Sequence, residues 1–219
     1  MTNDRLHHGE GGDSQAEQFW EKSYREHERG WSGEANAYLV EVAGSLPAGT
    51  ALELGCGEGG DAIWLAQQGW RVTAVDVSAT ALRRAAARAA AAGVADRVDV
   101  QRHDLAHSFP AGAFDLVCAL YLHSPVEFPR DRVLQAAARA VAPGGLLLVV
   151  EHGSAPPWSW NRDPHARFPT PQETLAALDL TPGQWRTERL GAPERLGSGP
   201  NGESATVKDN VIAVRRLAP

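Results

Sequence analysis

The chain has 219 residues, of which 43% are hydrophobic and 22% are charged. This composition predicts a folded domain with a sizeable core, and it excludes a chain that is mostly disordered. The formal net charge of −6 argues against a nucleic acid or an anionic membrane as partner. No apolar run is long enough to span a bilayer and no signal peptide opens the chain, so we expect a cytoplasmic protein.

The chain is expected to form a single domain over residues 14–219. Residues 1–13 are polar and glycine-rich, which predicts a disordered tail. Aromatic residues at helical spacing predict a first helix over residues 15–28, and a second amphipathic helix follows over residues 34–45. We interpret residues 14–48 as a helical cover on the rest of the domain.

Short apolar strands then alternate with helices. Strands are predicted at residues 50–54, 71–75, 97–102, 114–122 and 145–151, and helices at residues 59–68, 78–92 and 131–141. The strands are apolar along almost their whole length, which is typical of a parallel sheet buried on both faces. The alternation therefore predicts a doubly wound α/β fold with helices on both faces of a mostly parallel sheet.

The C-terminal part is less regular. Residues 154–170 are rich in proline and tryptophan, which predicts an irregular loop that forms a lid or a pocket wall, or alternatively a surface loop whose tryptophans pack on the core. A short helix is predicted at residues 171–180, two strands at 184–190 and 206–216, and a long hairpin loop between them at 191–204.

A glycine-rich turn follows the first strand of the alternation, with the sequence Glu53-Leu54-Gly55-Cys56-Gly57-Glu58-Gly59. Glycines at a strand-to-helix turn let the backbone approach a ligand, and the helix N-terminus supplies N–H donors. Asp76 ends the next strand, where an acidic side chain can accept both ribose hydroxyls of a nucleotide-like cofactor. Gly55, Gly57 and Gly60 also satisfy the G-x-G-x-x-G pattern of dinucleotide sites, so NAD remains an alternative.

Three observations favour S-adenosylmethionine (SAM) over NAD. The acidic Glu53 is a poor neighbour for a pyrophosphate but suits a cationic sulfonium and an amino group. About fifty residues precede the first strand, whereas a dinucleotide domain often starts near it. Asp104 follows the third strand, where its carboxylate can accept from the exocyclic amine of adenine.

These segments resemble class I SAM-dependent methyltransferases, most strongly over residues 50–152. Residues 53–59 look like the glycine-rich motif of that family, Asp76 like its ribose acid, Asp104-Leu105 like its adenine motif, residues 114–118 like its fourth strand, and residues 143–145 like the turn before its fifth strand. Residues 19–36 are similar to the small-molecule branch that includes tellurite-resistance and thiopurine methyltransferases. The resemblance implies a Rossmann-like sheet of seven strands, mostly parallel, with an antiparallel C-terminal strand.

The resemblance also implies a set of residues that bind SAM. These are Trp31, Glu53, Gly55, Cys56, Gly57, Gly59, Asp76, Val77, Asp104, Leu105, Leu120 and Tyr121. In this set Glu53 is expected to orient the amino group, Asp76 to hold the ribose and Asp104 to hold the adenine edge. Trp31 is expected to close over the methionine end or the substrate, or alternatively to pack on the second helix.

The candidate catalytic residues are His123, which follows the fourth strand, and His152, which follows the fifth. A thiolate acceptor needs no base, whereas a hydroxyl or ammonium acceptor must lose a proton. Either histidine alternatively shapes the pocket without taking a proton. No metal site is expected, because no cysteine or histidine spacing is typical of one.

We therefore expect a SAM-dependent methyltransferase that acts on the S, O or N nucleophile of a small molecule. Trp20, Trp31, Trp158 and Trp160 fall in the regions that would enclose such an acceptor. The alternatives are a SAM- or nucleotide-binding protein without transfer activity and an NAD-dependent oxidoreductase. We expect neither a nucleic acid nor a membrane as a partner. A second copy of the chain, forming a homodimer, is the candidate protein partner.

Overall fold

The computed structural model describes residues 14–26, 33–159, 167–199 and 202–218. The helices in this part of the chain are α1 (Gln15–Glu26), α2 (Ala37–Ala43), α3 (Gly60–Gln67), α4 (Ala79–Ala91), α5 (Arg130–Arg139) and α6 (Pro171–Ala177), with a 3₁₀ turn at Ala95–Arg97. The strands are β1 (Thr50–Leu54), β2 (Arg71–Asp76), β3 (Val98–Arg102), β4 (Phe114–Leu120), β5 (Val141–His152), β6 (Trp185–Gly191), β7 (Glu194–Ser198) and β8 (Ser204–Arg216). The predicted tail at residues 1–13 lies outside the described residues, as do Trp31 and Trp160.

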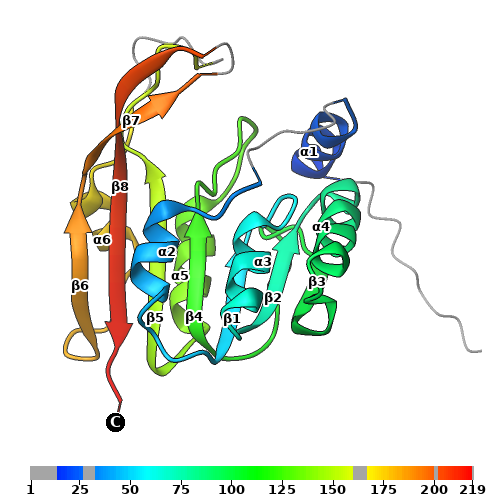
Figure 1. Cartoon of the computed structure of the whole chain (residues 1–219). Helices are drawn as coiled ribbons and strands as arrows, with labels where there is room; N and C mark the ends of the chain where they lie inside the picture. Colours follow the sequence, from blue (N-terminus) through cyan, green and yellow to red (C-terminus); the bar gives the residue numbers. More distant parts are fainter. Residues whose placement is uncertain (1–13, 27–32, 160–166, 200–201, 219) are drawn as a thin grey trace, which may run out of the picture.

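The central sheet has the strand order β3-β2-β1-β4-β5-β8-β6. Strands β1 to β5 pair in parallel, whereas β8 runs antiparallel to both β5 and β6. These seven strands confirm the predicted mostly parallel sheet with an antiparallel strand near its C-terminal end. The carboxyl ends of β1 to β5 meet at one edge of the sheet, the upper edge in Figure 1.

Two hydrophobic cores lie on opposite faces of this sheet. The apolar run in β5 supplies both, because alternate side chains of a strand point to opposite faces. Leu146, Leu148 and Val150 pack with residues of α2, α3 and α4, whereas Leu147 and Val149 pack with residues of α5 and the end of α6. The helices on both faces seen in Figure 1 therefore follow from continuous apolar strands.

Helix α2 begins later than the sequence predicts. The Asn36 side chain accepts a hydrogen bond from the backbone N–H of Tyr38 at 2.9 Å, and this cap starts the helix at Ala37 rather than at residue 34. Helix α6 has a capping box in which Thr170 and Glu173 satisfy each other's backbone N–H groups. Local side-chain caps thus set the starts of both short helices.

The predicted loop at residues 191–204 contains a strand. Strand β7 pairs antiparallel with the first part of β8, from Glu194 opposite Lys208 to Ser198 opposite Ser204. The two strands form an arm that extends beyond the carboxyl edge of the sheet (Figure 1). A Cβ atom on Gly199, just after β7, would lie 2.8 Å from the Trp158 ring. Gly199 contributes to the prediction of a loop, whereas in the structure its lack of a side chain leaves room for the Trp158 ring against the arm.

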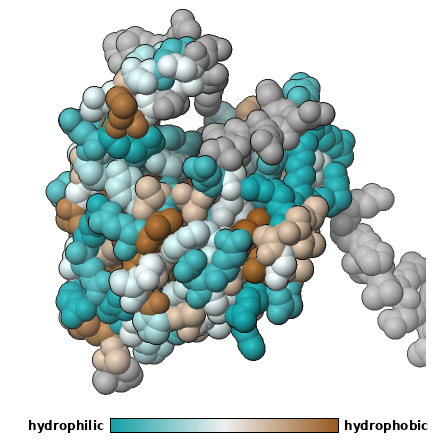
Figure 2. All heavy atoms as spheres, viewed as in Figure 1, coloured by the Kyte–Doolittle hydropathy of each residue, from teal (hydrophilic) through white to brown (hydrophobic). Residues whose placement is uncertain are grey.

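Apolar residues on the described surface are scattered. The exposed large hydrophobic side chains are Phe19, Val40, Leu196 and Leu217, which come from separate parts of the chain. On the face drawn in Figure 2, hydrophobic residues lie singly among hydrophilic ones. None of the described helices has the length and apolar character that crossing a membrane requires.

Candidate active site

Most of the predicted cofactor residues lie at the carboxyl ends of β1, β2 and β3, whereas Leu120 and Tyr121 lie at the end of β4 and Trp31 is outside the described residues. The backbone N–H groups of Gly55 and Cys56 both donate to the carbonyl of Val75, at 2.8 and 2.9 Å. The N–H of Gly57 donates to Oδ2 of Asp76 at 2.9 Å. These bonds join the glycine turn after β1 to the end of β2, so the turn and Asp76 form one rigid unit.

The glycine turn requires glycine at several positions. Gly55, Gly57 and Gly59 have φ angles of 71°, 52° and 79°, a region that residues with a Cβ rarely adopt. A Cβ on Gly55 would lie 2.8 Å from Cδ1 of Leu122, and one on Gly59 would lie 3.0 Å from Cβ of Ala85. The turn therefore combines a special backbone with close surroundings, as expected for a cradle around a ligand.

Glu53 is buried directly beside this turn. The residue is 3% exposed, and its Oε2 atom has no hydrogen-bond partner among the described residues. Burial, with the nearby charges of Asp61 and Asp76, raises the pKa of Glu53 well above its usual range. A buried, unpartnered carboxyl oxygen costs free energy unless a donor reaches it, and a cationic amino group of a ligand would be such a donor.

Asp76 is also buried, and burial raises its pKa despite hydrogen bonds from backbone N–H groups. Both carboxylate oxygens accept such bonds, Oδ2 from Gly57 and Oδ1 from Ser78, each at 2.9 Å. The side chain is thus held in one orientation at the end of β2. The next residue, Val77, accepts a hydrogen bond at its carbonyl from Arg102 of β3 at 3.2 Å.

Asp104 lies in the turn after β3. Its Oδ1 accepts from the N–H of Ala106 at 3.0 Å, and its Oδ2 lies 2.9 Å from Nδ1 of His107. Burial alone would raise the pKa of Asp104, but hydrogen bonds from Ser14, Ala106 and His107 outweigh burial and lower it. Leu105 packs against the core on the α5 side of the sheet.

Helix α1 contacts the same edge of the sheet. Glu21 accepts hydrogen bonds from the hydroxyl of Ser78 at 2.7 Å and from the N–H and hydroxyl of Thr80 at 3.0 and 2.6 Å. Burial would raise the pKa of Glu21, but these bonds and one from Arg25 lower it to about 2. Nε1 of Trp20 donates to the Ser124 hydroxyl at 3.3 Å. These contacts join α1 to the start of α4 and to the loop after β4. The sequence analysis did not identify Glu21, because its partners lie more than fifty residues away in the chain.

The thiol of Cys56 is buried in the core, as is that of Cys118, and burial raises both pKa values well above the usual range. Neither is a reactive thiolate. Leu120 is half-buried at the end of β4 and packs on the core beneath α2 and α3. Cys56 and Leu120 therefore contribute apolar walls rather than polar contacts.

The two candidate catalytic histidines lie together beyond β4 and β5. Their ring centroids are 5.1 Å apart, and the ring of Tyr121 stacks on His152 with centroids 4.5 Å apart. Tyr121 has a φ of 52°, which is uncommon for a residue with a side chain and typical of functional sites. Burial and the charge of Asp209 raise the pKa of Tyr121 to about 12, so the phenol is neutral.

His123 is exposed overall, yet its pKa is lowered to about 4 by partial desolvation and by the charges of His152 and Arg130. The ring is therefore neutral at pH 7.

Glu151, also at the end of β5, is fully engaged by other residues. Its carboxylate pairs with Arg130 and accepts from the Thr174 hydroxyl at 2.5 Å, so it holds the sheet to α5 and α6.

Two residues that sequence reasoning did not single out complete this cluster. Arg195 of β7 donates from Nε to the carboxylate of Asp209 in β8, and from Nη2 to the Tyr121 hydroxyl at 3.3 Å. Asp209 lies opposite His152 in the β5–β8 pairing. A signal was present in the sequence, because Asp209 and Asn210 are polar residues just before an apolar stretch of a predicted strand.

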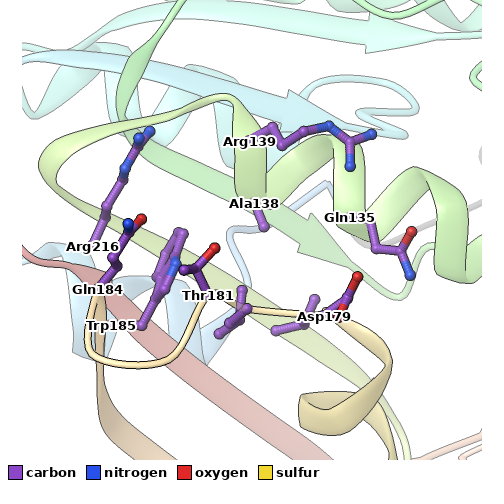
Figure 3. A pocket seen from close by; sticks show the side chains of 10 residues that line it. Gln135, Ala138, Arg139, Asp179, Thr181, Gln184, Trp185 and Arg216 are labelled. Carbon is purple, nitrogen blue, oxygen red and sulfur yellow. The ribbon is translucent and has the colours of Figure 1, made fainter.

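A cavity of about 250 Å³ lies elsewhere (Figure 3). It is lined by α5, the segment between α6 and β6, and the ends of β6 and β8, including Arg139, Asp179, Trp185 and Arg216. Trp185 and Arg216 pair with each other where β6 begins and β8 ends. This is the amino edge of the parallel strands, opposite the edge that carries the glycine turn, so the cavity is separate from the candidate site. Among the described residues no group of three or more histidine, cysteine or acidic side chains is arranged to hold a metal ion.

Comparisons with known proteins match the part of the chain that carries the glycine turn. The family described as "Methyltransferase domain" matches residues 51–145. A ubiquinone biosynthesis O-methyltransferase of Cronobacter sakazakii is 36% identical over 49% of this chain and 44% of its own length. A probable thiol methyltransferase 2 of Arabidopsis thaliana is 32% identical over 64% of this chain and 66% of its own length. A SAM-dependent Diels-Alderase, iccD, of Talaromyces variabilis is 28% identical over 79% of this chain and 61% of its own length.

Solved structures show the same fold. The structure of TehB from Haemophilus influenzae superposes with a TM-score of 0.66 at 16% identity, over 92% of this chain and 67% of that one. The match spans 44% of the length of the ubiquinone biosynthesis O-methyltransferase and 61% of that of the Diels-Alderase. The residues matched by the methyltransferase-domain family include the glycine turn, Asp76, Asp104 and the ends of β1 to β4. Residues 51–145 therefore form a class I SAM-dependent methyltransferase domain, whose cofactor is S-adenosylmethionine.

Proposed function

We propose that the protein transfers a methyl group from SAM to a small-molecule acceptor. The observation that carries this proposal is the buried Glu53 carboxyl, whose Oε2 has no partner among the described residues beside a turn of three positive-φ glycines. An oxygen in that position suits the cationic amino group of SAM. A nucleotide pyrophosphate would instead meet a carboxyl there, which is why NAD is the weaker candidate.

When bound, SAM supplies an electrophilic methyl group on a sulfonium, a good leaving group. The residues of this chain bind and orient it. Asp76 is placed to accept from the ribose hydroxyls and Asp104 from the adenine amine, while the glycine turn lets the backbone approach the methionine part. Leu120 and Tyr121 lie at the end of β4, where they face the reacting centre, and apolar walls there exclude water.

The acceptor is proposed to lie beyond the ends of β4 and β5, beside Tyr121, His123 and His152. One side of that space is formed by the β7–β8 arm, against which Trp158 packs. Relatives named as an O-methyltransferase and a thiol methyltransferase favour an oxygen or sulfur nucleophile on a small molecule. The acidic net charge disfavours RNA as the acceptor. We further propose that residues 14–48 cover the cofactor, since α1 contacts Ser78, Thr80 and Ser124 at the site edge.

Calorimetry with SAM, S-adenosylhomocysteine and NAD tests the cofactor assignment. We expect binding of the first two and none of NAD, whereas tight NAD binding without SAM binding would contradict the proposal. Turnover is then measured as formation of S-adenosylhomocysteine with a panel of phenols, thiols, amines and total RNA. Turnover on the small molecules supports the proposal, and turnover on RNA alone would contradict the acceptor class.

A second candidate function is SAM binding without methyl transfer. It is favoured by the similarity to the protein named a SAM-dependent Diels-Alderase, which covers 79% of this chain. In that case SAM binds but no S-adenosylhomocysteine forms with any acceptor of the panel.

A further inference from the structure

The polar cluster behind His152 is built from three strands and a loop. His152 is the last residue of β5, and Asp209 lies opposite it on β8. The Nδ1 atom of His152 is 3.8 Å from Oδ1 of Asp209. The Asp209 side chain is completely buried, whereas that of His152 is 36% exposed. The carboxylate thus sits behind the ring, and the ring lies between the carboxylate and the surface.

The two oxygens of Asp209 are in different states. Oδ2 accepts from Nε of Arg195, which also donates to the Tyr121 hydroxyl. Oδ1 has no hydrogen bond among the described residues, although it is buried. A buried carboxylate oxygen without a donor is costly, and Nδ1 of His152 is a potential donor close to it. A small movement of the ring closes that contact.

Other contacts limit how the ring can move. Tyr121 stacks on the His152 ring at an interplanar angle of 25°, and the backbone N–H of Asp209 donates to the carbonyl of Pro193 at 3.1 Å. Tyr121 is itself fixed by its hydrogen bond from Arg195. The His152 ring is therefore stacked on one face by Tyr121, and the Asp209 carboxylate lies behind its Nδ1 atom. This arrangement favours one ring orientation and one tautomer.

His123 has no comparable partner. Desolvation of the ring, and then the charges of His152 and Arg130, disfavour its protonated form. A ring that resists protonation is a weak base at neutral pH. Of the two histidines, His152 is the one with a carboxylate able to stabilise the imidazolium that forms when it accepts a proton.

We propose that Asp209 is a positioning residue that accepts a hydrogen bond from Nδ1–H of His152 and so leaves Nε2 of that ring as the base for a neutral hydroxyl acceptor. This inference rests on the proposed methyl transfer and specifies its acceptor class as an alcohol or phenol. The acceptor O–H bond breaks and its proton goes to Nε2 of His152. The electron pair left on oxygen forms the bond to the methyl carbon of the sulfonium donor, and the sulfur keeps the pair of the bond that breaks.

The first test reads the His152 ring directly. In ¹⁵N-labelled protein, long-range ¹H–¹⁵N correlation spectra of the neutral ring distinguish a proton on Nδ1 from one on Nε2. We expect the Nδ1–H tautomer in the wild-type protein and a change to Nε2–H in Asp209→Asn, because an asparagine can present an N–H to Nδ1. Asp179→Asn, an exposed site with the same loss of charge, is the matched control and keeps the Nδ1–H tautomer. A wild-type ring protonated on Nε2 would overturn the proposal, whatever acceptor the protein uses.

The second test compares two acceptors of different ionisation. Catechol is neutral and needs a base, whereas 4-nitrothiophenol is already a thiolate at neutral pH and does not. We expect Asp209→Asn to lower kcat with catechol by about 10²-fold, the lower range for general-base catalysis, with the KM for SAM and turnover of 4-nitrothiophenol nearly unchanged. An equal loss on both acceptors, or turnover of the thiol but not of catechol by the wild-type protein, would overturn the base role.

A third variant guards against a folding defect in Asp209→Asn. His152→Gln alters a part-exposed residue, and we expect it to reproduce the catechol-specific loss. The double variant should lose no more activity than His152→Gln alone, because both changes disable the same Asp209–His152 pair. Losses that multiply would show that Asp209 acts independently of His152. Failure of the proposed function is separately visible as absence of SAM binding in calorimetry, a result that leaves the tautomer measurement intact.

Discussion

The contact of Glu21 with the start of α4 predicts a measurable stability difference. Glu21 accepts three hydrogen bonds from Ser78 and Thr80, which follow Asp76 in the chain, and a fourth from Arg25. They lower its pKa from 4.5 to about 2, although burial acts in the opposite direction. At about 1.4 kcal/mol per pKa unit, this difference sets a ceiling of about 3.4 kcal/mol on the stabilisation by the charged form.

The expected effect is smaller than that ceiling. Solvent near α1 screens the charge, and glutamine at position 21 keeps one acceptor oxygen. We therefore expect Glu21→Gln to lower the free energy of unfolding at pH 7 by about 1–3 kcal/mol. Glu26→Gln, at an exposed position of the same helix, is the control and should change it by less than about 0.5 kcal/mol.

The pH dependence gives a sharper test. A depressed pKa means that the stabilisation is fully present above pH 4.5 and is lost as the pH falls through about 2. Urea unfolding of the wild-type protein and Glu21→Gln at several pH values should show a gap that is constant above pH 5 and closes as the pH falls below 4. A gap under about 0.5 kcal/mol at pH 7, or one that persists unchanged in acid, would refute the reasoning.

Three further predictions concern the cofactor cradle. Asp76→Ala should weaken SAM binding by at least about tenfold in calorimetry, whereas Asp99→Ala, on the exposed part of β3, should not, and wild-type affinity in the first variant would remove the ribose assignment. Gly59→Ala should cost about 2 kcal/mol in urea unfolding, because φ is 79° and Cβ would lie 3.0 Å from a neighbouring Cβ; Gly183→Ala has the same backbone strain with open space, so an equal cost would contradict the steric part. Glu53→Gln should weaken SAM binding by about tenfold in calorimetry, since it replaces the buried carboxyl whose unpartnered Oε2 is proposed to receive the amino group; an unchanged affinity would contradict that role.

The glycine turn and its position beside Asp76 could be predicted from the sequence because their determinants are local. A sharp turn between β1 and α3 needs glycines with positive φ, and these leave a recognisable spacing that ends near Asp76. The apolar strands likewise encode their own burial, since each face of β5 packs into a separate core. In both cases the physical requirement falls on residues that are neighbours in the chain.

The other half depends on contacts between distant segments. Glu21 meets Ser78 and Thr80 across more than fifty residues, and its sequence context is that of an ordinary surface position on an amphipathic helix. Strand β7 is not predicted, because Gly197 and its two charged residues are typical of a loop; the strand is formed by its pairing with β8. Such contacts follow from the assembled fold and leave only weak local signals.

The order of the two histidines illustrates the same point. Sequence position favours His123, which follows β4 closest to the expected reacting centre. The fold places Asp209 behind His152 through the β5–β8 pairing and brings Arg195 to that carboxylate through β7. Basicity in a protein depends on what surrounds a ring rather than on its place in the chain, and here the only neighbour that can stabilise an imidazolium among the described residues of the cluster stands behind His152. A chain with the same strands but without the β7–β8 arm would keep its cofactor cradle and lose the group that fixes this base.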